Sequence, residues 1–280
     1  IVDVDHMPYF PLFSVWIVCK LKRKKMYATW HEVWSRKYWS DYLGIFGIFG
    51  YFIERLGEWL PYKIITNSTS TRDKLADRHP QKKSKLVAGF CGVDLNEIAS
   101  VKPSSKSYDV MYAGRLLRHK NVGDLVEALR EVKRTHKDVS CAVIGNGPER
   151  DKLIVLAKKL RVNKNIEFID FLPDQKDLYS LMKSAKVFVQ PSNREGFGIV
   201  VVEANACGIP VITSNHYDNA AKDLIIEGMN GYLFCSTEEL SQKINICIEK
   251  VDKDKRKYTQ AVQQYDWESA TSLVLKAYTA

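Results

Sequence analysis

The sequence has few cysteines, and none lies in a pattern that binds a metal or builds a disulfide framework. Six cysteines are spread between Cys19 and Cys247, with no C-x-x-C pair and no histidines at zinc-ligand spacing. Several lie in apolar runs of strand or helix character, where buried reduced thiols are the simplest interpretation. This usage excludes a zinc ribbon and a disulfide scaffold, and we expect a cytoplasmic protein.

Long hydrophobic segments are also missing. The longest apolar run, from Leu43 to Ile53, is shorter than the roughly 20 residues that a membrane-spanning helix needs. The charged residues Glu54 and Arg55 follow it directly. No signal peptide, internal repeat or low-complexity tract stands out in the sequence.

What remains is an ordinary globular composition, 45% hydrophobic and 27% charged, over 280 residues. A single core rarely grows beyond about 250–300 residues, so the length predicts two domains. The formal charge of +9 favours anionic partners without choosing among phosphorylated substrates, acidic membranes and nucleic acid. Because the basic residues form no recognised binding module, we do not expect a nucleic-acid partner.

From Tyr108 onward, short buried strands alternate with helices. The predicted helices cover residues 121–135, 149–160, 174–184, 198–206, 219–226 and 237–250. This alternation predicts an α/β fold with a parallel sheet covered on both faces, as in a doubly wound Rossmann-like domain. Ligands of such sheets bind outside the carboxyl ends of the strands. The loops to watch are therefore 114–120, 145–148, 170–173 and 192–198.

The first hundred residues show a weaker α/β pattern, with few strands and a helix that begins at Thr69. The polar stretch from Val101 to Ser107 contains a proline and is typical of a linker. We predict a partial N-terminal domain at 1–100, a linker at 101–107 and a C-terminal domain at 108–262. A helix within 263–280 ends the chain, and its packing back on the N-terminal domain is left open.

Two glutamates flank a glycine-rich loop in the stretch PSNREGFGIVVVEANA. Glu195 lies in the loop after a buried strand, and Gly198 lets the backbone approach a ligand where the next helix begins. Glu203 lies further into that helix between VVV and ANA, so we expect it to be buried and to have partners. Carboxylates at such different depths suit two parts of one elongated ligand, whereas a metal chelate needs them closer. The alternative is a helix-start charge and a surface residue.

Cations follow another strand end, in the stretch AGRLLRHKN. After Gly114, Arg115 offers a planar fork and Lys120 a mobile charge, a pair suited to neutralising a diphosphate. Two ordinary surface bases would look the same. Gly145 belongs to a G-x-G turn that local geometry alone explains. His31, in TWHE at a predicted strand end, is a lone histidine, a kind that is more often structural than catalytic.

The motifs GR-x4-KN, GxGP, PS-x2-EGFG-x4-E and G-PV occur in one order. Together they resemble the C-terminal domain of the family-four glycosyltransferases, strongly from Tyr108 to Phe234 and loosely on either side. The resemblance implies the GT-B fold, in which two Rossmann-like domains face each other across a cleft. It implies a retaining transferase that moves sugar from a UDP- or GDP-linked donor to a glycan, lipid or small-molecule acceptor. The family generally needs no bound metal, which agrees with the lack of a D-x-D motif in a donor-side loop.

The resemblance also implies a role for each matching position. Arg115 and Lys120 would bind the diphosphate, Glu195 the sugar hydroxyls and Glu203 the ribose. His31 would face the sugar from the other domain. The remaining donor-binding positions are Gly114, Gly145, Phe171 and Leu172 near the base, and the backbone of Phe197, Gly198 and Ile199.

The chain departs from the family at its start, where relatives have a first strand and a glycine-rich loop before the position of Ile1. We therefore expect a fragment of a longer protein. Asp170 and Cys91 stand where relatives often have glycine and asparagine. Other readings stay open: a nucleotide-sugar-binding fragment without transferase activity, or an epimerase or phosphorylase of the same fold.

A basic run from Lys20 to Lys25 follows an apolar segment, and more aromatics follow in LGIFGIFGYF. One interpretation is a surface helix and loop that dock on an anionic membrane, at the inner face of the cell membrane. The other is a core helix with a solvated basic end. The sequence does not choose between them.

Overall fold

The computed structural model of the protein describes residues 1–250 and 255–279, and the chain divides into two compact units. Unit 1 contains Ile1–Cys91 and the C-terminal segment from Glu268, and unit 2 contains Gly92–Trp267. Every strand pairing in either sheet is parallel. The α/β class predicted from the sequence is therefore confirmed.

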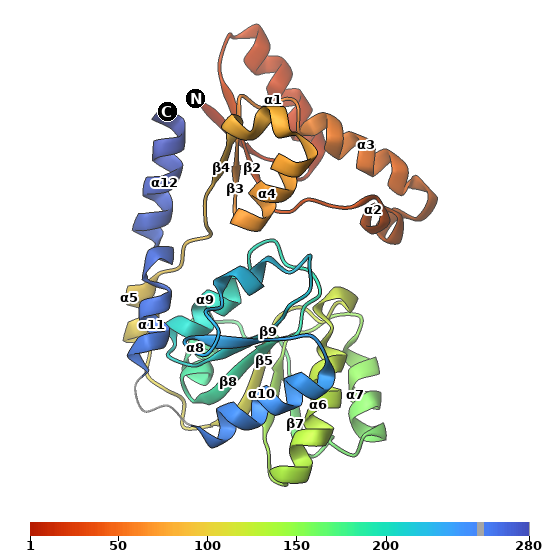
Figure 1. The fold of residues 1–280 in the computed structure, drawn as a ribbon, viewed down its shortest axis with the longest axis vertical. Helices are drawn as coiled ribbons and strands as arrows, with labels where there is room; N and C mark the ends of the chain where they lie inside the picture. Colours follow the sequence, from red (N-terminus) through yellow and green to blue (C-terminus); the bar gives the residue numbers. More distant parts are fainter. Residues whose placement is uncertain (251–254, 280) are drawn as a thin grey trace. The chain divides into compact units, whose positions relative to one another are not determined.

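Unit 1 is built on a four-stranded sheet in the order β1-β2-β3-β4 (Figure 1). The strands are β1 (Val2–Asp5), β2 (Met26–Trp30), β3 (Lys63–Thr66) and β4 (Leu86–Ala88). The helices are α1 (Tyr9–Leu21), α2 (Arg36–Leu43), α3 (Gly47–Gly57) and α4 (Thr69–Arg78), with 3-10 turns at Gly44–Phe46 and Pro80–Lys85. Trp30, Leu12 and Leu75 are fully buried and join β2, α1 and α4 in one core.

The last helix, α12 (Trp267–Thr279), belongs to unit 1 for nearly all of its length. Ala277 is buried with Tyr27 and Ile65 of the sheet. The Tyr27 hydroxyl donates to the carbonyl of Tyr278 at 3.3 Å, and the two rings meet edge to face. The chain end thus supplies part of the apolar cover of the first sheet.

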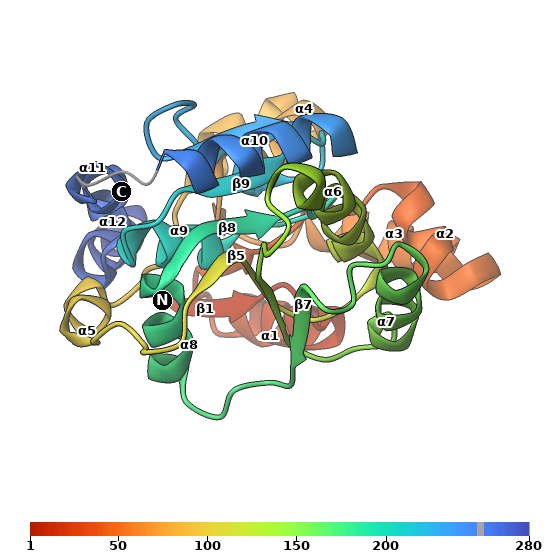
Figure 2. The ribbon, with the colours of Figure 1, turned by 90° about the horizontal axis from the view of Figure 1, so that it is seen from below.

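Unit 2 carries a six-stranded sheet in the order β10-β9-β8-β5-β6-β7 (Figure 2). The strands are β5 (Tyr108–Ala113), β6 (Cys141–Ile144), β7 (Ile166–Ile169), β8 (Ala185–Gln190), β9 (Val211–Ser214) and β10 (Gly231–Phe234). The helices are α5 (Leu95–Ser100), α6 (Val122–Thr135), α7 (Arg150–Lys159), α8 (Gln175–Lys183), α9 (Ile199–Ala206), α10 (Thr237–Glu249) and α11 (Arg256–Ala261), with 3-10 turns at Arg118–Lys120, Ala220–Leu224 and Gln263–Tyr265. Helices α6, α7 and α10 share the main core on one face, while α8 and α9 cover the other.

The unit boundaries differ from the predicted ones, because the predicted linker at 101–107 packs inside unit 2. The Ser104 amide donates to the carbonyl of Ser180 at 2.9 Å, and the Ser180 hydroxyl donates to the carbonyl of Lys102 at 2.9 Å. Ser184 bonds the same stretch at the carbonyl of Ser104. Backbone groups of Lys102 and Ser104, within the predicted linker, thus take part in hydrogen bonds that hold this segment along the end of α8.

Two predictions about single helices can be compared with the structure. The helix predicted at 219–226 is a short 3-10 turn, Ala220–Leu224, whose first turn is capped by the side chain of Asn219. Across the described residues, the structure contains no helix with the length and apolarity needed to cross a membrane.

Candidate functional site

The site lies where the direction of strand addition reverses in unit 2. After β5 the chain adds β6 and β7 on one side, and it then returns to place β8 against the free edge of β5. The loops that leave β5 and β8 therefore diverge at the carboxyl ends of two neighbouring strands. A doubly wound sheet has its ligand crevice at this position.

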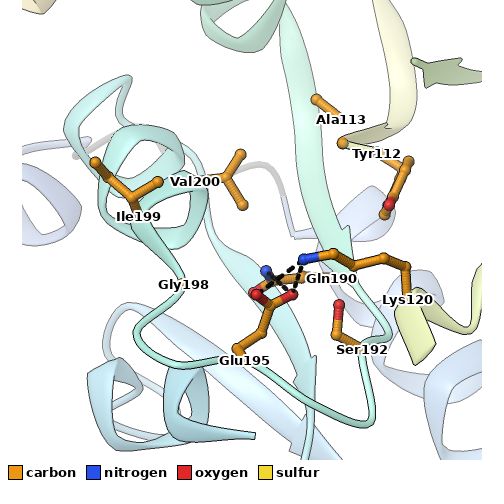
Figure 3. Close-up of a pocket in the computed structure, with 10 residues that line it drawn as sticks. Tyr112, Ala113, Lys120, Gln190, Ser192, Glu195, Gly198, Ile199 and Val200 are labelled. Atoms are coloured by element: carbon orange, nitrogen blue, oxygen red, sulfur yellow. Dashed lines mark hydrogen bonds and ion pairs between the residues drawn. The ribbon is translucent and has the colours of Figure 1, made fainter. Parts of the chain in front are cut away.

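An ion pair joins these two loops (Figure 3). Lys120, which follows β5, places its Nζ 2.7 Å from Oε1 and 2.9 Å from Oε2 of Glu195, which follows β8. The side-chain Nε2 of Gln190, at the end of β8, donates to the same Oε1 at 2.9 Å. Only 17% of the lysine side chain and 10% of the glutamate side chain are exposed, so water screens the pair weakly. The pair holds a cation and a carboxylate at fixed positions in the crevice.

The pair forms one wall of a pocket of about 170 Å³. Its lining residues are Tyr112, Ala113, Gly114, Lys120, Gln190, Ser192, Glu195, Gly198, Ile199 and Val200. Ligand sites for whole cofactors usually reach about 300 Å³ or more, so this pocket fits one part of a longer ligand. The hydroxyl of Ser192 is buried and has no hydrogen-bond partner among residues 1–250 and 255–279, which leaves it for a ligand.

Helix α9 begins at the opposite wall of the pocket, where Gly198 and Ile199 lie. Gly198 adopts a φ of +94°, and a Cβ there would come within 2.5 Å of the Ala221 Cβ. Glycine is therefore required both by the backbone and by the space. The first amides of a helix have no partner within it and face the positive end of its dipole, an arrangement that suits an anion.

Cations gather at the carboxyl end of β5. Burial lowers the pKa of His119 to about 4, with further lowering by the charges of Arg194, Lys120 and Arg115. Arg115 is exposed and does not line the pocket, and its carbonyl accepts a hydrogen bond from the Tyr112 hydroxyl at 3.1 Å. A neutral histidine among three cations indicates a positive potential at this edge of the sheet.

Glu203 lies one turn into α9, away from the residues that line the pocket. The residue is 5% exposed, and its Oε1 accepts hydrogen bonds from Gln175 Nε2 at 2.6 Å and from the Tyr179 hydroxyl at 2.9 Å. Burial raises the pKa of its carboxyl, against the effect of these two donors. The predicted burial and the predicted need for partners are confirmed.

The other predicted donor residues are dispersed over unit 2. Phe197 is buried with its ring 5.6 Å from that of Tyr265, so only its backbone is available to a ligand. Phe171 is 81% exposed in the loop after β7, and Leu172 beside it is half-buried. Gly145 follows β6 and packs against the backbone of Gly114. Their predicted contacts with a nucleotide sugar stay predictions.

His31 lies in unit 1, directly after β2. Its Nε2 is 3.1 Å from Oδ1 of Asp5, and its amide donates to Nδ1 of the buried His6 at 3.4 Å. Asp3, two residues before Asp5 in β1, accepts hydrogen bonds from the hydroxyls of Thr29 and Tyr278. The predicted contact between His31 and a sugar stays a prediction.

The sequence reading missed several polar residues of this site. Gln190 and Ser192 line the pocket, Gln175 and Tyr179 bond Glu203, and His119 is surrounded by cations. The sequence contains a signal for Gln190, because this polar residue follows the apolar run VFV and therefore lies at the carboxyl end of a buried strand, where ligands bind.

In the part of the chain that the structure describes, no group of three or more His, Cys, Asp or Glu side chains is placed to hold a metal ion. The carboxylate of Glu195 already pairs with Lys120 rather than with a second acid. Metal independence stays a prediction.

Comparison with curated proteins finds similarity to enzymes of glycan synthesis. The chain is 28% identical over 226 residues to a glycogen synthase of Mycobacterium tuberculosis, a match that covers 78% of this chain and 54% of the relative. It is 34% identical over 145 residues to the O-antigen biosynthesis glycosyltransferase WclY of Escherichia coli, covering 49% and 38%. The matched part of the chain thus spans about half the length of the glycogen synthase and less than half that of WclY.

Among solved structures, HepE of Anabaena in complex with UDP superposes with a TM-score of 0.81 at 20% identity, covering 99% of this chain and 78% of HepE. This likeness establishes the fold, and the predicted GT-B class is confirmed. The family described as glycosyl transferases group 1 matches residues 94–264, which include every element of the pocket. The chain belongs to the glycosyl transferases group 1 family.

Proposed function

We propose that this chain carries the donor-binding site of a retaining glycosyltransferase, which takes its sugar from a UDP- or GDP-linked donor without a metal ion. The observation that carries the proposal is the Lys120–Glu195 pair, set in a pocket between two strand ends and the start of α9. A cation, a carboxylate and free helix amides are the groups that a sugar diphosphate requires.

The proposed division of labour follows from the chemistry of each group. Lys120 and Arg115 neutralise the diphosphate as it leaves, together with the first amides of α9. Glu195 accepts hydrogen bonds from hydroxyls of the transferred sugar, and Lys120 keeps its carboxylate in place. The unpaired Ser192 hydroxyl lies in the same pocket and can contact phosphate or sugar. None of these steps needs proton transfer by the protein at the phosphate.

Binding and transfer require separate tests, since the chain spans about half the length of a curated relative. Calorimetry with UDP and GDP tests the site itself and identifies the base. Incubation with the matching nucleotide sugar and an acceptor, followed by NMR of the product's anomeric carbon, tests the reaction. An inverted product would overturn retention, and failure to bind either nucleotide would overturn the donor site.

Nucleotide binding should raise the pKa of His119. The charges of Arg194, Lys120 and Arg115 contribute to the low value of about 4, and a bound diphosphate would offset them. NMR titration of the His119 ring with and without UDP measures the shift, with the exposed His216 as the internal control. A ring that titrates identically in both states would show that these cations do not face the phosphates.

Replacing Glu203 by glutamine should weaken nucleotide binding about tenfold or more. In the proposed site the Glu203 carboxylate accepts hydrogen bonds from the ribose hydroxyls of the donor. Hydrogen bonds to charged groups contribute about 1.5–3 kcal/mol. Glutamine keeps the shape, and its carbonyl can still accept from Tyr179. Calorimetry with UDP measures the change, and Glu131→Gln on α6, whose side chain is 38% exposed and pairs with Arg134, is the matched control. Unchanged affinity in Glu203→Gln would assign Glu203 to packing with α8 alone.

A further inference from the structure

Helix α3 of unit 1 buries its smallest residues. Gly47, Gly50 and Gly57 all face inward, and Glu54 is the one long side chain among the buried positions. A Cβ at Gly50 would lie 2.2 Å from the ring of Trp39, so the helix backbone rests directly on that indole. The fully buried positions of α3 are therefore three glycines and one carboxylate, with Tyr51 and Ile53 packed partly against the core beside them.

The outer face of α3 carries the large apolar residues. Phe49, Phe52 and Leu56 lie at helical spacing on one stripe and are 63%, 56% and 59% exposed. Ile45 and Phe46, just before the helix, are 86% and 62% exposed. Helices of soluble proteins normally point such residues into the core, whereas in α3 the phenylalanines and Leu56 point outward and only Tyr51 and Ile53 pack partly against the core. A contiguous exposed stripe of this kind marks an interaction surface.

Buried hydrogen bonds of Glu54 and Glu58 hold α3 in this orientation. Glu54 accepts hydrogen bonds from the Trp34 amide at 2.9 Å and from Trp39 Nε1 at 2.5 Å, and Arg78 Nη1 lies 3.3 Å from its Oε1. Glu58, just after the helix, accepts from Arg78 Nη1 at 2.8 Å and also binds His79. Turning the phenylalanines inward would break these buried bonds and leave Glu54 and Glu58 without their partners.

A basic pocket continues the apolar stripe. Trp59, three residues after Leu56, is 52% exposed and belongs to a pocket of about 310 Å³ between the end of α1 and the start of β2. The pocket is lined by Trp16, Cys19, Lys20, Lys24, Lys25, Met26, Trp59, Leu60, Pro61, Tyr62 and Lys85. Lys25 Nζ lies 4.2 Å from the ring centre of Tyr62. Four lysines and three amphipathic rings thus line this pocket, which begins three residues after Leu56, and Figure 1 shows α3 itself at the edge of unit 1.

We propose that α3 and this basic pocket form a docking surface for an anionic membrane. Phenylalanine and leucine would enter the acyl boundary, the tryptophans and Tyr62 would lie at the headgroup level, and the lysines would pair with lipid phosphates. With 11 residues, α3 lies in the interface rather than across the bilayer. Charge complementarity selects a lipid surface over a second copy of the chain, whose own lysines would repel these.

Flotation with vesicles of phosphatidylcholine, with and without phosphatidylglycerol, tests the proposal on the whole chain. We expect binding only to the anionic vesicles. The variant Lys20→Gln/Lys24→Gln should bind roughly 30-fold more weakly, from about fivefold per lysine near the surface. The variant Phe49→Ser/Phe52→Ser/Leu56→Ser should lose at least about tenfold. The matched control on α7, Val155→Ser/Lys158→Gln/Lys159→Gln, replaces equally exposed residues and should bind as the wild type.

Three outcomes would overturn the proposal: no binding to anionic vesicles, equal binding to both vesicle types, or wild-type binding by both variants. A dimer seen by ultracentrifugation that the phenylalanine variant abolishes would assign the stripe to a second copy instead. UDP affinity should be the same in all variants, because every residue changed lies outside the donor pocket. A failure of vesicle binding therefore leaves the proposed donor site unaffected. A failure of UDP binding likewise leaves the proposed docking surface unaffected.

Discussion

Replacing Lys120 by methionine should lower sugar transfer by about 10²–10³-fold, the loss typical when one preorganised charge is removed from a transition state. Methionine keeps much of the length and apolar stem of lysine, and it cannot stabilise a departing diphosphate. The effect should fall mainly on kcat, since negative charge on the phosphate grows as the bond to the sugar breaks. Initial rates of nucleotide release at saturating donor measure it.

Two controls separate chemistry from folding in this variant. Lys120→Met leaves the shielded Glu195 without its cation, so thermal unfolding should be compared with that of Lys120→Met/Glu195→Gln, in which no carboxylate is left unpaired. Lys152→Met removes a lysine that is 73% exposed in its pair with Glu149, and it should transfer at the wild-type rate. Near-normal turnover by folded Lys120→Met would remove this lysine from the proposed mechanism.

The fold of unit 2 could be predicted because its signals are local. Each strand is a short apolar run, and each following helix shows its own periodicity, as β5 and α6 illustrate. Unit 1 was harder, since α3 reverses the usual pattern and presents its phenylalanines outward. Its orientation depends on Glu54 finding Trp39 and Arg78, contacts that arise only after the helices have packed.

For the candidate site, too, the sequence predicts the positions of the residues but not their contacts. The places of Lys120 and Glu195 follow from the rule that ligands bind at the carboxyl ends of strands. Their pairing does not, because 75 residues separate them and only the order of the strands brings β5 and β8 together. The partners of Glu203 come from α8, the helix before α9 in the chain, and the sequence pattern alone does not show that Gln175 and Tyr179 point toward this carboxylate.

Replacing Gly145 by alanine should cost the most stability of any single change considered, about 3–5 kcal/mol. The residue has a φ of +132°, which alanine adopts only with strain, and a Cβ there would lie 2.0 Å from the carbonyl oxygen of Gly114. Neither atom belongs to a flexible side chain, so one strand end must move. Because Gly114 begins the loop that leads to Lys120, UDP binding should weaken along with folding.

Urea unfolding followed by far-UV circular dichroism measures this cost, and α6 supplies a matched glycine. A Cβ at Gly123 would meet only Leu156, at 3.9 Å, so Gly123→Ala should be neutral or stabilising by up to about 1 kcal/mol. The same chemical change thus has opposite expected signs at two positions of one domain. If Gly145→Ala unfolded at the same urea concentration as Gly123→Ala, the two strand ends would not be in the close contact from which the geometry of the pocket follows.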